Sequence, residues 1–200
     1  MARPQLGART EIVKRQGIEI MVAMDVSTSM LAEDVKPNRL TRAKQAVRSL
    51  LGRLQGDRIG LVVFAGAAYL QCPMTSDYSA VQLFLDGVDT ETISTQGTAI
   101  GEALHLAMKS FDDNQESQKV IMLLTDGEDH EGDPVEAAED AAGMGIRIYP
   151  IGIGTPFGEP IPLSKSAGAT SEVKRDESGA IVMSRLDELT LEKIADRTSS

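Results

Sequence analysis

Four short, nearly continuous apolar runs constrain the fold of this chain more than any other feature. They are "IEIMVAMD" (18–25), "RIGLVVFA" (58–65), "KVIMLLTD" (119–126) and "GIRIYPIGI" (145–153). A strand with one solvated face alternates apolar and polar residues, whereas a strand inside a parallel sheet is buried on both faces and reads as a continuous apolar run. The runs therefore predict a parallel sheet that needs helices above and below it.

Segments of helical periodicity lie between these runs. Three apolar stripes recur at steps of three and four residues: Leu40, Ala43, Val47, Leu50 and Leu54; Val81, Phe84, Leu85 and Val88; Ile100, Ala103, Leu104, Ala107 and Phe111. A fourth helix is expected to start at Asp133 and Pro134, and a last one carries Leu186, Leu189 and Ile194 on one side. Gly56 and Gly145 fit stop signals after the first and fourth helices. The alternation predicts an α/β fold, a doubly wound, mostly parallel open sheet flanked by helices.

Two segments depart from this alternation. The stretch "AAYLQCPM" (67–74) closely follows the second run, which predicts a short antiparallel edge strand. Prolines and an Asp-Glu-Ser-Gly turn predict a β-hairpin excursion near 155–185. We expect residues 1–17 to form a lead-in segment and residues 18–200 a single domain. The last helix runs to the end of the sequence, as in a domain truncated at its C-terminus.

Charge and composition limit the kinds of partner that this chain can bind. The 20 basic and 30 acidic residues give a net charge of -10, which opposes nucleic acid and anionic membrane surfaces. No apolar stretch reaches the roughly 20 residues that a membrane helix needs, so this fragment itself is expected to be soluble and to make no membrane contact. Cys72 is the single cysteine, which excludes an internal disulfide, and it is expected to be a small buried hydrophobe.

Polar side chains stand where two of the predicted strands end. Asp25 closes the first run and Asp126 closes the third. In doubly wound sheets ligands gather beyond the carboxyl ends of the strands, and two carboxylates there repel one another unless a cation or a proton lies between them. Ser27 and Ser29 alternate with Asp25, so in an extended loop all three face one point. Thr98, in "STQGTAIGEAL", brings another hydroxyl from a separate loop.

An all-oxygen set with few carboxylates suits a hard divalent cation. We expect Mg²⁺, with Mn²⁺ or Ca²⁺ as alternatives. Zn²⁺ is not expected, because the set contains no Cys or His. The acidic run "DGEDHEGD" (126–133) misses the spacing of a calcium loop and is expected to be a solvated rim.

Each residue also has a structural explanation. An Asp at a strand end often only forms a turn or caps a helix, and Asp126-Gly127 alone would indicate a turn. Thr98 alone would indicate the N-cap of the helix that follows it, although capping and metal ligation are compatible.

The three pieces together resemble a known site. Asp25-Val-Ser-Thr-Ser29, Thr98 in a separate loop and Thr125-Asp126-Gly127 are similar to the metal-ion-dependent adhesion site (MIDAS) of von Willebrand factor A domains, over roughly residues 18–155. The segments "DVKPNRLTRAKQ", "GDRIGLVVFAG" and "GTAIGEAL" resemble more narrowly the bacterial Bat-type aerotolerance proteins.

The resemblance implies a function. Ser27, Ser29 and Thr98 would bind the ion directly, and Asp25 and Asp126 through water or hydrogen bonds. A protein partner would supply an Asp or Glu to the metal, and the domain would have no catalytic activity. The Bat-type resemblance implies a domain flanked by membrane helices in the full-length protein and facing the periplasm at the bacterial inner membrane.

The alternative is a magnesium-dependent phosphotransfer enzyme of the haloacid dehalogenase type, which also places an Asp at the end of its first strand. Such enzymes carry a second Asp two residues later as the general acid, and here that position is Ser27, which does not protonate a leaving group usefully at neutral pH. The sequence also lacks G-x-G-x-x-G after the first strand, a P-loop and a G-x-S-x-G elbow.

Overall fold

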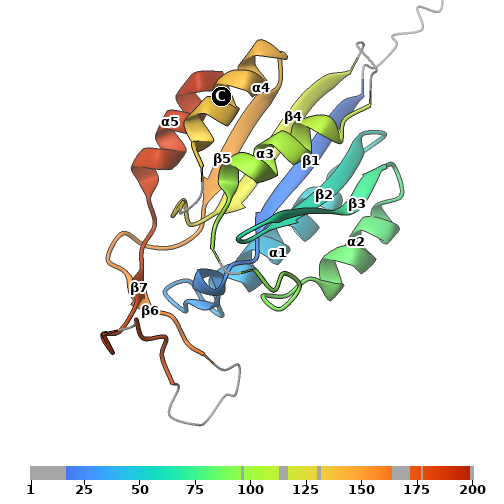
Figure 1. Cartoon of the computed structure of the whole chain (residues 1–200). Coiled ribbons are helices and arrows are strands. Elements are labelled where there is room, and N and C mark those ends of the chain that lie inside the picture. Colours follow the sequence, from blue (N-terminus) through green and yellow to red (C-terminus); the bar gives the residue numbers. More distant parts are fainter. Residues whose placement is uncertain are drawn as a thin grey trace, which may run out of the picture.

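The computed structural model describes residues 17–95, 97–112, 117–129, 132–163, 172–176 and 178–198. Its centre is a five-stranded sheet of order β3-β2-β1-β4-β5 (Figure 1). The strands are β1 (Ile18–Asp25), β2 (Arg58–Phe64), β3 (Ala68–Thr75), β4 (Gln118–Thr125) and β5 (Arg147–Gly152). All neighbours pair in parallel except β2 and β3, which are antiparallel. The predicted α/β fold with an antiparallel edge strand is confirmed.

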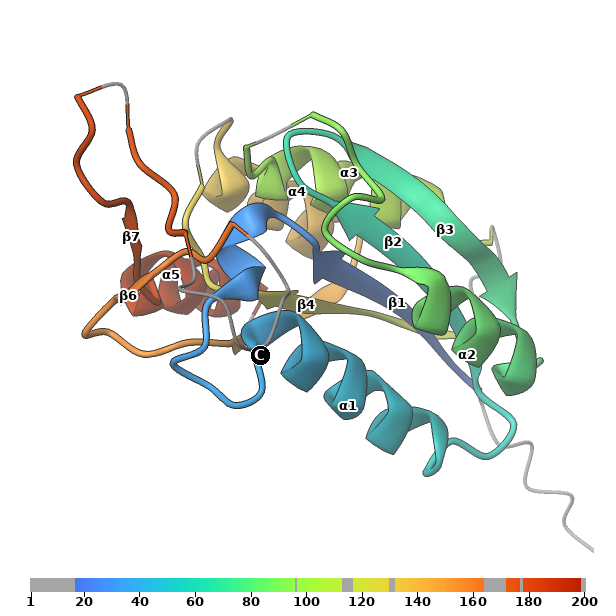
Figure 2. The same cartoon turned by 90° about the horizontal axis from the view of Figure 1, so that it is seen from below.

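Helices cover both faces of the sheet (Figure 2). The helices are α1 (Arg39–Leu51), α2 (Tyr78–Gly87), α3 (Ile100–Lys109), α4 (Pro134–Gly143) and α5 (Glu188–Thr198), with a short 3₁₀ helix η1 (Thr28–Leu31) after β1. Met24 of β1 packs in one core cluster with residues of α1 and α2, whereas Ala23 packs in the other with residues of α3, α4 and α5. Successive residues of β1 thus face two apolar layers, which explains its continuous apolar sequence.

The helix signals in the sequence hold in part. Asp133 caps α4 as predicted, because its Oδ1 accepts hydrogen bonds from the backbone N of Val135 and Glu136 at 2.9 and 3.2 Å. Gly145 follows α4 with a φ of 71°. The stop predicted at Gly56 is wrong, since α1 already ends at Leu51 and Gly56 lies in the turn before β2.

Two residues of the predicted apolar stripes are exposed. Phe84 of α2 and Leu189 of α5 have 40% and 68% of their surface accessible. On α5, Ile194 packs into the core as predicted, and Leu191 three residues before it takes the inward position expected of Leu189. An apolar residue at the edge of a helical stripe can face the core or the solvent, and the sequence pattern does not distinguish the two.

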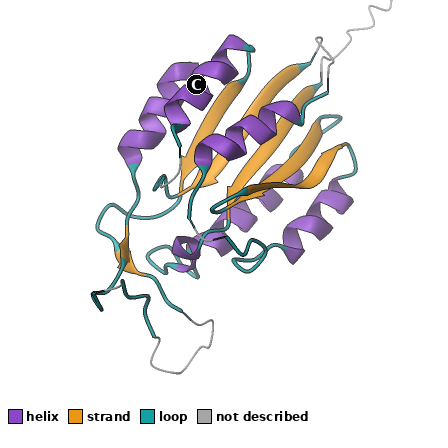
Figure 3. Cartoon of the chain, viewed as in Figure 1, coloured by secondary structure: helices purple, strands orange, loops and turns teal. Residues whose placement is uncertain are grey.

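The predicted β-hairpin excursion is confirmed, but the residues that pair are not the expected ones. β6 (Glu159–Pro160) pairs antiparallel with β7 (Met183–Ser184), so the two ends of the excursion form a short sheet (Figure 3). The turn after Asp176 is present, where the backbone N of Asp176 donates to the carbonyl of Ala180 at 2.9 Å. Proline has no N–H for a ladder, and Pro160 and Pro162 keep the pairing short. Residues 164–171 lie outside the described part of the chain.

Three expectations concern the remainder of the chain. Cys72 is buried in β3, as expected of a small apolar side chain. The lead-in predicted for residues 1–17 lies outside the described residues except for Gly17. None of the described helices has the length and hydropathy needed to cross a membrane.

Candidate metal centre

The carboxyl ends of β1 and β4 meet at one corner of the sheet. β1 is central and pairs in parallel with both β2 and β4. After β1 the chain forms β2 on one side of it and later β4 on the other side. Such a reversal of strand order is where α/β sheets bind ligands. Asp25 ends β1, Asp126 directly follows β4, and both side chains are fully buried.

Hydrogen bonds fix the Asp25 carboxylate from two directions. Its Oδ1 accepts from the backbone N of Ser27 at 2.8 Å, which folds the loop after β1 back on itself. Its Oδ2 accepts from the hydroxyl of Thr125, the last residue of β4, at 2.7 Å. Asp25 is therefore held between its own loop and the neighbouring strand.

The hydroxyls of Ser27 and Ser29 are hydrogen-bonded to one another. The two Oγ atoms are 2.9 Å apart, and both side chains are almost buried. Adjacent ligands of an octahedral Mg²⁺ with bonds of about 2.0–2.1 Å lie about 2.9 Å from each other. The pair thus has the spacing of two neighbouring ligands of one small cation.

Thr98 reaches this corner from a different loop. The backbone N of Val26 donates to the carbonyl of Phe64, and that of Ala99 to the carbonyl of Ala65, both at 2.8 Å. Consecutive carbonyls at the end of β2 thus anchor the loop that carries Ser27 and the loop that carries Thr98. Thr98 itself is buried, and no residue in the described ranges hydrogen-bonds to its hydroxyl.

The interpretation of Thr98 as a helix cap is wrong. The N-cap position of α3 is Ala99, and the backbone N of Ile100 donates instead to Oδ1 of Asp129 at 3.2 Å. A carboxylate from the acidic run therefore takes the role that Thr98 would have had, and the Thr98 hydroxyl is not used for capping.

The acidic run is a solvated rim only in part, because Asp133 is exposed but the residues next to the site are less so. Glu128 and Asp129 are half-buried. Oε1 of Glu128 accepts from the backbone N of Arg185 at 2.9 Å, while Asp129 and Asp133 cap α3 and α4. The run positions backbone around the site. His130 and Glu131 lie outside the described residues.

Asp126 differs from Asp25 in its partners. Its Oδ2 accepts from Nη1 of Arg39 at 3.0 Å and from Oγ of Ser184 at 3.2 Å, and its Oδ1 accepts from the backbone N of Glu128 at 3.2 Å. Arg39 and Ser184 are buried. Neither was predicted from the sequence as part of the site. The available signal is that Arg39 precedes Ala43 by four residues, on the inward stripe of α1.

Burial first and the charge of Asp126 second raise the pKa of Asp25 to about 7, although hydrogen bonds from Thr125 and Ser27 act to lower it. A carboxylate in this setting is stabilised by a proton or by a nearby cation. The hard-oxygen donors, the spacing of the serine hydroxyls and this carboxylate together fit a divalent cation. No cluster of three His, Cys, Asp or Glu suited to a metal exists within the described ranges.

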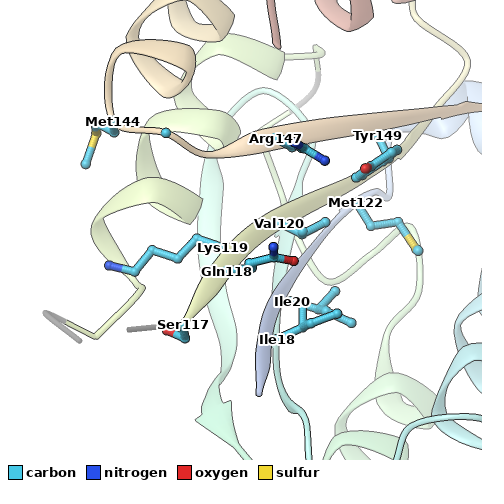
Figure 4. A pocket seen from close by; sticks show the side chains of 11 residues that line it. Ile18, Ile20, Ser117, Gln118, Lys119, Val120, Met122, Met144, Arg147 and Tyr149 are labelled. Carbon is cyan, nitrogen blue, oxygen red and sulfur yellow. The ribbon is translucent and has the colours of Figure 1, made fainter. Parts of the chain in front are cut away.

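A separate cavity of about 720 Å³ lies at the other end of the sheet (Figure 4). Its lining includes Ile18, Gln118 and Arg147, which begin β1, β4 and β5. Ile18 and Asp25 stand at opposite ends of β1, roughly 23 Å apart for an extended strand. The described lining residues include no carboxylate, so this cavity is not part of the candidate metal centre.

Known proteins resemble this chain in sequence and fold. The family model described as "von Willebrand factor type A domain" matches residues 20–128. The crystal structure of the conserved hypothetical protein BatB from Bacteroides thetaiotaomicron is 43% identical, covers 92% of this chain and 88% of that chain, and has a TM-score of 0.86. An aerotolerance-related membrane protein from Bacteroides fragilis, crystallised with multiple mutations to serines, is 40% identical, with coverages of 92% and 89% and a TM-score of 0.87.

A more distant structure bears on the metal. Proximal thread matrix protein 1 from the mussel byssus, with a zinc-occupied MIDAS motif, is 26% identical, covers 70% of this chain and 37% of that chain, and has a TM-score of 0.61. The present chain spans about half the length of the curated relatives it matches, 46% and 48% for two of them.

Proposed function

The chain belongs to the von Willebrand factor type A domain family, and we propose that it is a metal-ion-dependent protein interaction module that binds a carboxylate of its partner. The observation that carries the proposal is the 2.9 Å separation of the Ser27 and Ser29 hydroxyls beside the buried Asp25. Two hydroxyl oxygens at this spacing, with a carboxylate next to them, suit one hard cation.

Each residue has a proposed role. Ser27, Ser29 and Thr98 would hold the ion through their hydroxyl oxygens. Asp25 and Asp126 would act through water or hydrogen bonds and offset part of its charge. A bound dication would supply a Lewis-acidic centre for an Asp or Glu of the partner. Because neutral hydroxyls form the direct ligand set, the positive charge available to that carboxylate stays high.

The proposed ion is Mg²⁺, with Mn²⁺ and Ca²⁺ as alternatives. The set of hydroxyl and carboxylate oxygens favours these hard cations. The zinc-occupied motif of the mussel byssus protein supports a divalent cation in this kind of site, and it makes Zn²⁺ a necessary arm of any metal test.

The environment of Asp25 supports binding over catalysis. A phosphoryl-accepting Asp needs an accessible carboxylate oxygen, but Asp25 is fully buried and both of its oxygens accept hydrogen bonds. A phosphatase assay in Mg²⁺ separates the two functions. Turnover that disappears in Asp25→Asn would favour the phosphotransfer enzyme.

We further propose that residues 18–200 form a single domain, the soluble part of a Bat-type protein anchored in the bacterial inner membrane and facing the periplasm. The 40% identity to an aerotolerance-related membrane protein supports this, as does the greater length of the relatives. Protease accessibility of the full-length protein in intact spheroplasts tests the orientation, and protection from added protease would refute it.

Metal-dependent stabilisation tests the proposed function. Wild type should melt at a higher temperature in Mg²⁺, Mn²⁺, Ca²⁺ or Zn²⁺ than in chelator, since a ligand at a hundred times its Kd stabilises a fold by about 2.7 kcal/mol. Ser27→Ala should lose the shift. Ser49→Ala is the matched control, because Ser49 is an exposed residue of α1 whose hydroxyl donates to the carbonyl of Gln45 on its own helix.

A carboxylate arm extends this test to the partner. Glutarate or an acidic peptide should increase the shift only with metal present. If no cation alters wild-type melting, with or without the added carboxylate, the proposed function is wrong.

A further inference from the structure

Arg39 uses every donor of its guanidinium in the interior of the protein. Its side chain is fully buried at the first position of α1. Nε and Nη2 donate to the two carboxylate oxygens of Asp34 at 2.9 and 2.8 Å. Nη1 donates to Oδ2 of Asp126 at 3.0 Å and to Oγ of Ser184 at 2.6 Å, and Nη2 also donates to the carbonyl of Ser184 at 3.2 Å. These bonds account for all five N–H groups of an arginine.

The surrounding backbone is shaped to admit this side chain. A Cβ at Gly154 would lie 2.9 Å from Cζ and Nε of Arg39, and Gly154 has a φ of 147°. Thr155 next to it donates its backbone N to Oδ2 of Asp34 at 2.7 Å. The start of the excursion therefore packs against the guanidinium of Arg39 and hydrogen-bonds to the same Asp34 carboxylate.

The excursion also contacts the loop that carries Asp126. The backbone N of Asp187 donates to the carbonyl of Asp126 at 2.8 Å, and that of Arg185 to Oε1 of Glu128 at 2.9 Å. Arg39 thus lies where the loop after β1, the loop after β4 and the excursion meet. Its Nη1 contacts Asp126, a predicted metal residue, directly.

We propose that Arg39 is a positioning residue of the metal site: it orients Asp126 and couples the site to the excursion, so that metal binding steadies residues 183–187. The inference rests on the proposed function. With Arg39 and Ser184 on Oδ2 and the backbone of Glu128 on Oδ1, the Asp126 carboxylate has a single orientation. Oδ2 accepts two bonds and Oδ1 one, which leaves Oδ1 one further site for a water or an ion.

Binding of Mn²⁺ alone tests the proposal, read from the loss of the free-ion electron paramagnetic resonance signal. Arg39→Lys keeps a positive charge but not the five-donor fork, and it should weaken Mn²⁺ binding about 10- to 100-fold, as changes behind metal ligands typically do. Arg48→Lys is the matched control on the same helix, because within the described part of the chain the Arg48 side chain forms just an exposed ion pair with Asp86. It should bind as wild type does.

Hydrogen exchange separates positioning from general stability. In wild type, Mn²⁺ should slow exchange of the Arg185 and Asp187 amides, which bond to Glu128 and Asp126. In Arg39→Lys, saturating Mn²⁺ should no longer slow them. A merely structural role would instead speed their exchange with and without metal, and the metal effect would persist, which would overturn the proposal.

Ser184→Ala keeps the test decisive if Arg39→Lys does not fold. It removes one hydrogen bond to Asp126 while both ion pairs of Arg39 remain. Loss of one such bond should weaken Mn²⁺ binding about two- to tenfold. If wild type binds Mn²⁺ and the folded variants bind it equally well, the inference fails and the proposed function stands. If wild type does not bind, both fail.

Discussion

The Thr125 hydroxyl donates to Oδ2 of Asp25 at 2.7 Å, and this bond joins the ends of the two central strands at the candidate metal centre. The same hydroxyl oxygen accepts from the backbone N of Gly127 at 3.1 Å. One buried side chain therefore fixes both the carboxylate that ends β1 and the backbone after Asp126. The two halves of the site are coupled before any ion binds.

Replacing Thr125 with valine should weaken metal binding without changing the shape of the core. Valine has nearly the same volume but leaves Asp25 and the Gly127 amide without this partner. The unpaired buried groups should cost about 1–3 kcal/mol of folding free energy. The affinity for Mn²⁺ should fall about 10- to 100-fold, as is typical when a hydrogen-bond partner of a metal ligand is lost. Urea unfolding and Mn²⁺ titration measure the two effects.

Thr41→Val is the matched control for that variant. Thr41 lies on α1, its backbone N donates to Asn38, and its hydroxyl has no hydrogen-bond partner among the described residues. The control should retain wild-type Mn²⁺ affinity. Equal affinity in Thr125→Val and Thr41→Val would show that the Thr125 bond does not support the site.

Stability in the absence of metal should fall as the pH rises. The pKa of Asp25 is raised from 3.8 to about 7 in the folded protein by burial first and by Asp126 second. Between about pH 4 and pH 7 the folded state therefore keeps a proton that the unfolded chain has released, so the free energy of unfolding decreases through this window. Urea unfolding in chelator across this range measures the slope.

Asp25→Asn is the control for this pH dependence, because an amide has no proton to release. Its stability should fall less steeply than that of wild type over the same range, and added Mg²⁺ at neutral pH should stabilise wild type alone. Parallel pH slopes for the two proteins would rule out Asp25 as their source.

Gly127→Ala should be more costly than its backbone conformation alone requires. Gly127 has a φ of 82°, and a Cβ there would lie 2.7 Å from the carbonyl oxygen of Asp187. The left-handed conformation costs a residue with a Cβ about 1–2 kcal/mol, and the clash adds to it by displacing the start of α5. Gly179→Ala isolates the first effect, since Gly179 has a φ of 84° and nothing within 4 Å. Similar unfolding free energies in the two variants would contradict the predicted clash.

The sequence predicted the sheet well because each strand reports its own surroundings. A strand such as β1 is apolar on both faces, and its residues alone reveal the two layers that cover it. Asp25, Ser27 and Ser29 could be grouped because they are close in sequence. The extended loop expected there is wrong, however, because residues Thr28–Leu31 form the 3₁₀ helix η1. Asp126 could be placed beside them because the carboxyl ends of parallel strands share an edge of the sheet, whereas Thr98 ends no strand and was expected there as a hydroxyl from a separate loop.

The partners of Asp126 could not be derived in this way. Arg39 and Asp126 are 87 positions apart. Helical periodicity marks Arg39 as facing inward but does not identify the carboxylate it meets. Ser184 belongs to a ladder between two short flanks of the excursion, and their register depends on contacts with the rest of the domain. Burial of an arginine requires partners from several segments, and only the folded chain supplies them.

Removing the charge of Lys174 should favour the metal and disfavour an acidic ligand. Its Nζ donates to the hydroxyl of Thr28, between Ser27 and Ser29, at 3.2 Å, so a cation stands at the edge of the site. Lys174→Gln should tighten binding of Mn²⁺ alone by no more than about fivefold, because a half-exposed charge contributes about 0.2–1 kcal/mol, and should weaken binding of glutarate to the metal-loaded protein. Arg175→Gln is the control, since the side chain of the neighbouring, exposed Arg175 donates to the carbonyl of Gly179 and, among the described residues, not to Thr28. Calorimetry at low and high salt measures both affinities, and a change of the same sign in both would contradict an electrostatic role for Lys174.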